Sequence, residues 1–200
     1  MTLKLNGSTS GSVSIDAPAS TTGGADVALT LPVNDGDANQ FLQTNGSGVL
    51  SFAGVNPGRG AFNAYADADQ DFTQNNTAKC QFNAERFDVD SWYDHSTNYR
   101  YTPQIAGYYQ FNVNTKVTSG SDNSEIVVFI YKNGSNVRNI MNSGNGYGGY
   151  IGTNISSIIQ MNGSSDYVEV YLKSDDVHNG TRTMKADTNS EFSGFLVYPT

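Results

Sequence analysis

The residues best suited to catalysis are two histidines and one cysteine. His95 stands in the segment WYDHSTNY and His178 in KSDDVHNGT, and both segments are predicted to be loops. A positioned histidine can act as a general acid or base, but no serine or cysteine stands in a recognisable nucleophile motif. Cys80 is the only cysteine, and a lone cysteine is more often a small apolar core residue than a nucleophile. We therefore predict that the chain is not an enzyme.

Clustered acidic residues raise the question of a metal site. The segment DADQD, Asp67 to Asp71, is similar to the start of a calcium-binding loop. Phe72 stands where that loop requires glycine, and Ala78 stands at its twelfth position, where it requires glutamate. We predict a solvated turn and no cofactor, with loosely bound Ca²⁺ as the alternative. The neighbouring Asp175 and Asp176 are interpreted in the same way.

A glycine-rich segment, GNGYGG from Gly144 to Gly149, matches the pattern Gly-x-Gly-x-x-Gly. This pattern indicates dinucleotide binding only between a strand and a helix, and no helix is predicted here. We predict a loop whose tyrosines make contacts, since tyrosine gives contact area at low entropy cost. With a second loop at 174–187, the predicted binding residues are Tyr147, Tyr150, Asp175, Asp176 and His178.

The elements that must position these loops are β-strands. From Tyr109 onward, apolar and polar residues alternate, which is typical of a half-buried strand. Tyr109, Phe111 and Val113 are predicted to point into the core, and the residues between them toward a neighbour or solvent. Asn133-Gly134 follows a β-branched run, which predicts a tight hairpin. Many short strands separated by turns predict an all-β sandwich or barrel.

Composition and charge narrow the functional class. The hydrophobic fraction is 37 % and the charged fraction 15 %, with many Gly, Ser, Thr and Asn residues, which favours strands and turns. The net charge of −8 and pI of about 4.5 disfavour nucleic-acid binding. No apolar run approaches the roughly 20 residues of a membrane span, so no membrane insertion is expected. The start MTLKLNGSTSG is unlike a secretory signal, and we expect synthesis in a cytoplasm.

Two regions differ in aromatic content. Residues 1–58 contain Phe41 and Phe52 and no tyrosine, whereas residues 59–200 contain all 12 tyrosines and the single tryptophan. The join GVNPGRG is rich in turn residues and places the boundary near residue 58. The first region has strand spacing, including a hairpin at TNGSGVLSF, but too few apolar residues to close a core. We predict a β-rich segment that packs with identical copies, and a disordered tail is the alternative.

The second region contains a spaced series of aromatic residues with one aspartate and one glycine among them: Phe82, Asp88, Tyr93, Tyr101, Gly107, Tyr109 and Phe111. This series, with AGYYQF at its end, resembles the globular head of complement C1q, one of the tumour-necrosis-factor-like jelly rolls. The later segments YKNGSNV, SSIIQMNGSSDYVEVYL and FSGFLVY resemble later strands of that family in the same order. The sequence departs from the family pattern at Tyr101, where phenylalanine is usual, at Val113, where an aromatic residue is usual, and by one extra residue between Tyr93 and Tyr101.

The resemblance implies a ten-stranded jelly-roll sandwich that assembles as a homotrimer, with the strand of Tyr109, Phe111 and Val113 at the three-fold axis. Members of the family usually carry this head on a collagen stalk. This chain has no Gly-X-Y repeat, so residues 1–58 would take that role. The first region resembles segments of tailed-phage fibres, in SGSVSIDAPASTTGGADVALTLP and FLQTNGSGVLSFAG.

These resemblances lead to one main hypothesis for function. The chain is predicted to be a trimeric virion surface protein of a tailed bacteriophage, made in the host cytoplasm, either a short tail fibre or spike or a head fibre. Residues 1–58 would contact capsid or tail proteins, and the head would bind a host surface glycan or envelope protein. Two alternatives are a capsid decoration protein that stabilises the head and a non-viral C1q-like adhesin or lectin-like module. A glycan depolymerase would need paired carboxylates, for which only Asp88 with Asp90, or Asp175 with Asp176, are available.

Overall fold

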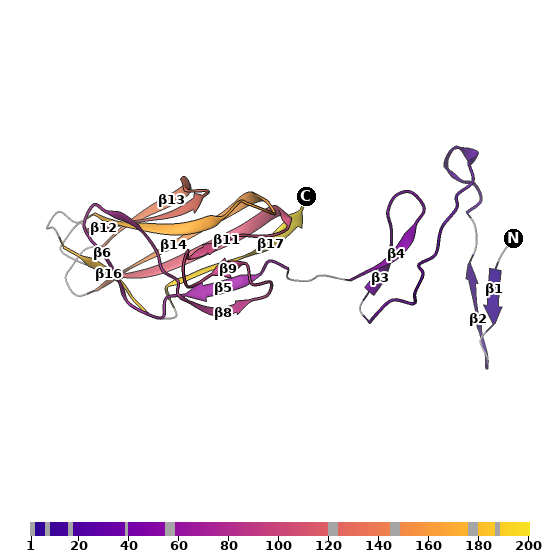
Figure 1. Ribbon diagram of the computed structural model, residues 1–200, viewed down its shortest axis with the longest axis horizontal. Helices are drawn as coiled ribbons and strands as arrows, with labels where there is room; N and C mark the ends of the chain where they lie inside the picture. The colour runs from indigo at the N-terminus through magenta and orange to yellow at the C-terminus, as the bar shows by residue number, and fades with distance from the viewer. Residues whose placement is uncertain are drawn as a thin grey trace. The chain divides into compact units, whose positions relative to one another are not determined.

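The chain divides into two compact units, Met1–Asn56 and Pro57–Thr200, close to the predicted boundary at residue 58 (Figure 1). The computed structural model describes residues 3–6, 9–15, 18–38, 40–54, 59–119, 124–144, 149–175, 180–186 and 189–200.

The second unit is built from strands alone in the part of the chain that the structure describes. Five of its strands have only two or three residues, so more strands are present than the ten predicted. The strands are β5 (Phe62–Tyr65), β6 (Gln70–Phe72), β7 (Thr77–Lys79), β8 (Ala84–Asp88), β9 (Tyr93–Asp94), β10 (Arg100–Tyr101), β11 (Ala106–Thr118), β12 (Ser124–Lys132), β13 (Ser135–Gly144), β14 (Tyr150–Asn162), β15 (Val168–Asp175), β16 (Arg182–Met184) and β17 (Glu191–Pro199).

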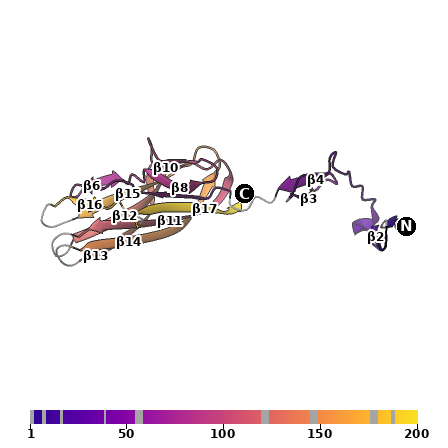
Figure 2. The same cartoon turned by 90° about the horizontal axis from the view of Figure 1, so that it is seen from below.

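These strands form two stacked sheets of antiparallel pairs (Figures 1 and 2). One sheet has the order β13-β12-β15-β10-β9, with β7 also beside β15. The other has the order β6-β16-β11-β17-β5-β8, with β14 on the far side of β11. The arrangement is a jelly-roll sandwich, which confirms the predicted fold class.

Strand β11 lies inside the second sheet and organises it. It pairs with β14 along its whole length and with β17 from Gly107 to Asn114. Tyr109, Phe111 and Val113 are completely buried, on the side that the alternation assigned to the core. The intervening side chains are partly or largely exposed, because successive residues of a strand point to opposite faces.

The core between the sheets is rich in aromatic rings. Phe62 stacks on Tyr101 with ring centroids 4.3 Å apart and meets Phe192 edge-on at 4.9 Å. The hydroxyl group of Tyr101 donates a hydrogen bond of 2.7 Å to the carbonyl oxygen of Gly60, and that of Tyr109 donates one of 2.9 Å to Ile105. Each large ring is therefore buried with its polar atom satisfied.

Two glycines are required by the backbone. A Cβ atom at Gly107 would lie 2.5 Å from the carbonyl oxygen of Tyr198, so only glycine lets β17 approach β11 at this point. Asn133 and Gly134 both have positive φ, +52° and +75°, and join β12 to β13 in a two-residue hairpin. This confirms the hairpin predicted from the Asn-Gly pair, since tight hairpin turns need this conformation.

The first unit consists of two hairpins and extended chain. Its elements are β1 (Leu3–Asn6), β2 (Ser12–Ile15), the short 3₁₀ helix η1 (Thr22–Gly24), β3 (Gln40–Thr44) and β4 (Leu50–Gly54). The β3-β4 hairpin is the one predicted from TNGSGVLSF, and the side chain of Asn45 accepts backbone hydrogen bonds in its turn. No described side chain of this unit is buried. No helix among the described residues is long and apolar enough to cross a membrane.

Replacing Phe111 with Ala should lower the free energy of unfolding by about 3–5 kcal/mol, because a fully buried ring would leave a cavity between the sheets. The measurement is urea unfolding at fixed protein concentration. Asn139→Ala, on the exposed strand β13, serves as the control and should change the unfolding free energy by less than about 0.5 kcal/mol. Equal, small losses for both variants would show that the register of β11 is wrong.

Candidate functional site

The outward face of the second sheet carries large apolar side chains at one end. We call this set the apolar face: Tyr108, Ile158, Phe195, Val197 and Tyr198. Tyr108 pairs with Tyr198 across β11 and β17, and Gln110 lies between Phe195 and Ile158, so the set spans three neighbouring strands. Tyr198 is 65 % exposed and Ile158 is 56 % exposed. Contiguous exposed apolar residues of this size mark interaction surfaces.

The other end of the same face is polar. The Asn114 amide donates a hydrogen bond of 3.0 Å to Oε1 of Glu191, and Arg86 donates one of 3.0 Å to Oε2. Lys116 lies over the ring of Tyr150, with its Nζ 4.5 Å from the ring centroid. An open groove of about 540 Å³ crosses this end, lined by residues that include Asn114, Lys116, Tyr150 and Glu191.

A second apolar surface lies at one edge of the sandwich. No described residue of β13 is buried, and its exposed apolar side chains are Val137, Ile140 and Met141. The Asn142 amide donates a hydrogen bond of 2.6 Å to the carbonyl oxygen of Gly152 in β14, which holds the two edge strands together. We call this edge, with Val137, Ile140 and Met141, the flank. The flank adjoins the apolar face, since Val137 and Ile158 line one pocket.

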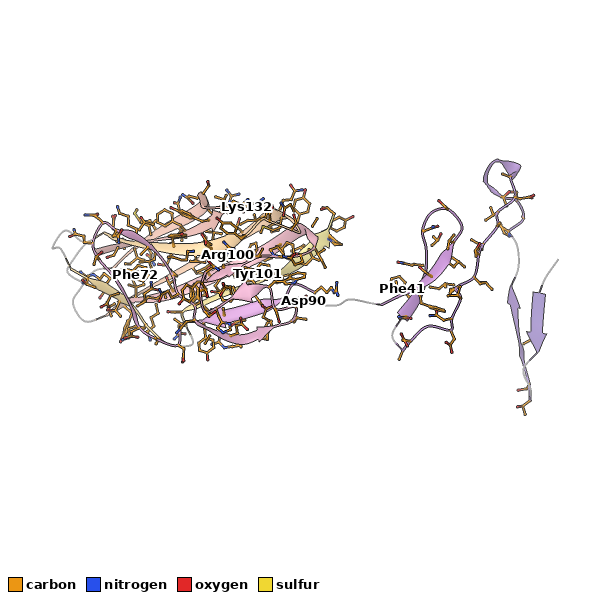
Figure 3. All side chains as sticks on the ribbon, viewed as in Figure 1. Phe41, Phe72, Asp90, Arg100, Tyr101 and Lys132 are labelled. Atoms are coloured by element: carbon orange, nitrogen blue, oxygen red, sulfur yellow. The ribbon has the colours of Figure 1, made fainter. Side chains whose placement is uncertain are left out.

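A third feature is a groove of about 360 Å³ beside β9 and β10, on the other sheet. It is lined by Ser91, Trp92, Tyr93, Asp94, Asn98, Arg100, Thr102 and Gln104. Arg100 and Tyr101, both labelled in Figure 3, are neighbours in β10. Tyr101 is completely buried in the core, so Arg100 leaves the opposite face of the sheet.

Asp94 fixes one wall of this groove. Its carboxylate accepts hydrogen bonds from the backbone N–H groups of Ser96, Thr97 and Asn98 and from the Asn98 amide. Burial raises the pKa of Asp94, but these hydrogen bonds outweigh it and hold the pKa well below its ordinary value. Asp94 is therefore an ionised structural residue whose oxygens are already used.

Comparison with known proteins decides the family. The sequence pattern of the C1q domain matches residues 61–197. The chain belongs to the C1q domain family. Among solved structures, Eiger TNF from S. frugiperda is similar, with a TM-score of 0.52 and 10 % identity over 68 % of this chain and 91 % of that one. Murine APRIL gives a TM-score of 0.49 and 9 % identity over 68 % and 96 %. The likeness to Eiger TNF shows the fold alone, and no curated protein matches the sequence.

The predicted binding residues of this C1q domain are placed only in part. Tyr150 begins β14, is 56 % exposed and lines the polar groove with Lys116. Asp175 ends β15, where it pairs with Glu125. The remaining predicted residues, Tyr147, Asp176 and His178, lie outside the described residues, so their contact role stays a prediction.

Four of the residues considered as metal ligands or catalytic groups, Asp69, Asp71, His95 and Cys80, are paired with other side chains or buried. Asp69 pairs with Lys185, and Asp71 accepts a hydrogen bond of 2.7 Å from the Thr183 hydroxyl, so these carboxylates have separate partners. No group of three metal-ligating side chains occurs within the described ranges. His95 is half-exposed and its Nδ1 lies 2.7 Å from Oε1 of Glu85. Cys80 is buried, which raises the pKa of its thiol.

The sequence did not predict the apolar face, the flank or the groove at Trp92. Phe195 and Tyr198 lie in the segment FSGFLVY, which the sequence relates only to a later strand of the C1q head, and Leu196-Val197 before Tyr198 breaks simple alternation. The structure explains this by a β-bulge between β11 and β17 at Tyr108 and Tyr109. The groove at Trp92 was missed because its lining comes from the loops around two very short strands. The only tryptophan of the chain was the one signal that pointed to it.

Proposed function

We propose that the protein is a homotrimeric binding protein in which the flank of one C1q domain packs against the apolar face of the next. The observation that carries this proposal is the apolar face itself, with Tyr108, Phe195 and Tyr198 exposed on one sheet. A contact between the apolar face of one copy and the flank of the next is heterologous, and such contacts form a ring when the rotation between copies closes. We set the number of copies at three because the C1q resemblance implies a trimer.

The first unit supports assembly through a separate observation. In the extended segment 25–33, large apolar side chains stand at alternate positions and are all exposed: Val27, Leu29, Leu31 and Val33. Thr30 joins this segment to the hairpin through hydrogen bonds with Gly48 and Leu50. Three heads would hold three such segments at high effective concentration. We propose that their apolar stripes then cover one another and form a short stalk.

We place this trimer on the surface of a tailed-phage particle, made in the host cytoplasm. Residues 1–58 would contact capsid or tail proteins, and the heads would bind a host surface glycan or envelope protein rather than act as an enzyme. Support comes from the resemblance of the first region to phage-fibre segments. Within this role we propose a short tail fibre or spike, or a head fibre. A capsid decoration protein and a free C1q-like adhesin remain the alternatives.

Phe195→Glu should convert the trimer to monomers at micromolar concentration, because three carboxylates would be placed in apolar contacts without partners. Sedimentation or light scattering measures this. Thr77→Glu, an exposed residue of β7 on the other sheet, is the matched control and should leave the assembly intact. If the Phe195→Glu protein stays trimeric, the apolar face is not part of the trimer interface.

Antibodies against the protein should label intact particles of the phage that carries its gene, seen by electron microscopy. Labelling at the tail with few copies would indicate a fibre or spike, and labelling over the capsid with many copies would indicate decoration or head fibres. Particles that contain none of the protein would contradict the virion assignment and favour the adhesin.

A further inference from the structure

The groove beside β9 and β10 contains the single tryptophan of the chain. Trp92 is half-buried, packs against the core and lies 6.2 Å from the ring of Tyr101. Its indole N–H has no hydrogen-bond partner among the described residues. The groove volume of about 360 Å³ lies within the range of roughly 300–1,000 Å³ that is typical of small-ligand sites.

Arg100 faces the groove with its hydrogen-bond donors unused. Its guanidinium is held by stacking, 4.5 Å above the ring of Tyr167, and it makes no ion pair or hydrogen bond with any residue that the structure describes. Arg86 is the contrast within the same molecule. It stacks 4.9 Å over Tyr65, but its Nη1 is bound by Asn63 and Glu191. A stacked guanidinium with free donors is oriented in advance for a ligand.

The carboxylates next to Arg100 across the strands have other partners. Asp94 is bound by the 96–98 loop, and Glu169 pairs with Lys79 and accepts a hydrogen bond from the Tyr171 hydroxyl. Two further carboxylates, Asp88 and Asp90, lie at the start of the loop that carries Trp92, and Asp88 accepts a hydrogen bond from the N–H of Tyr93. A site whose one unpaired cation is Arg100, among the residues that the structure describes here, is poorly suited to a phosphate ligand, which favours clustered cations.

The walls of the groove are held by the backbone. Ser91 and Tyr99 have φ of +58° and +49°, a conformation that is rare for residues with side chains. The Thr102 N–H donates a hydrogen bond of 2.8 Å to the carbonyl oxygen of Trp92, which ties the two walls together. Strained residues concentrate at ligand sites, where the surrounding contacts keep the geometry fixed.

Two amides complete the polar lining. The Asn98 Nδ2 group donates to Asp94, and the Gln104 Nε2 group donates to the carbonyl oxygen of Thr102. Both side-chain oxygens are left as acceptors. The groove thus combines Trp92 with two acceptors and the unpaired donors of Arg100.

We propose that this groove binds one sugar residue of a glycan. The indole would contact the C–H face of the ring, and Arg100, Asn98 and Gln104 would bind its hydroxyl groups. The proposal rests on the proposed function as a surface-binding protein and gives the host glycan a specific site. The apolar face lies on the other sheet, and the flank is β13, at the opposite edge of the sheet from β9, so assembly would leave the groove open.

Because Trp92 is the only tryptophan, intrinsic fluorescence of the full-length protein reports directly on this groove. The protein is titrated with a panel of neutral and uronic-acid oligosaccharides, and calorimetry is run in parallel. We expect at least one oligosaccharide to give a saturable change in Trp92 emission with Kd below about 1 mM. Arg100→Gln should weaken that binding at least about tenfold, which is about 1.4 kcal/mol.

Arg86→Gln is the matched control, since Arg86 also stacks on a tyrosine ring but lies on β8 outside the groove, and its binding should equal wild type once its oligomeric state is confirmed. No saturable signal from either method would overturn the site, and so would binding that Arg100→Gln leaves unchanged. These failures differ from failure of the proposed function. If the protein is a trimer on virions but binds no sugar, the proposed function stands and the sugar site is wrong. If the protein is a monomer that binds sugar at Trp92, the sugar site stands and the proposed assembly is wrong.

Discussion

A strand can bury only every second side chain, and this constraint acts most strongly at β11. Burying Tyr109, Phe111 and Val113 fills the core, and it forces Tyr108 and Gln110 outward between β14 and β17. The same pairing brings Ile158, Phe195 and Tyr198 beside them. The apolar face is therefore a direct consequence of the packing that stabilises the sandwich, and the core and the proposed interface depend on one strand register.

The two units differ in how far they bury their apolar side chains. The C1q domain closes its own core, with Phe62, Tyr101 and Phe192 in contact. The first unit has no buried side chain among those described, and Leu31 is 72 % exposed. Such a segment gains little from folding alone, because its apolar surface stays in water. We infer that the head determines the assembly and that the first unit gains order from it.

Much of the fold followed from local sequence rules. Alternation predicted β11, and the Asn133-Gly134 pair predicted the hairpin after β12, because both depend on neighbouring residues. The sites were harder to predict. Arg100 meets Tyr167, the residue before β15, only through long-range strand pairing, and the bulge in β17 shifts the residues that face outward. Of the predicted loop residues, Tyr150 alone has a described side chain, in a polar groove.

The central claim is that three copies cover one another's apolar faces. The most direct test is native mass spectrometry of the full-length protein at micromolar concentration. The account predicts one species of about 64.5 kDa, three times the 21.5 kDa chain. A single species at the mass of one chain would contradict it, because Tyr108, Phe195 and Tyr198 would then remain exposed to water.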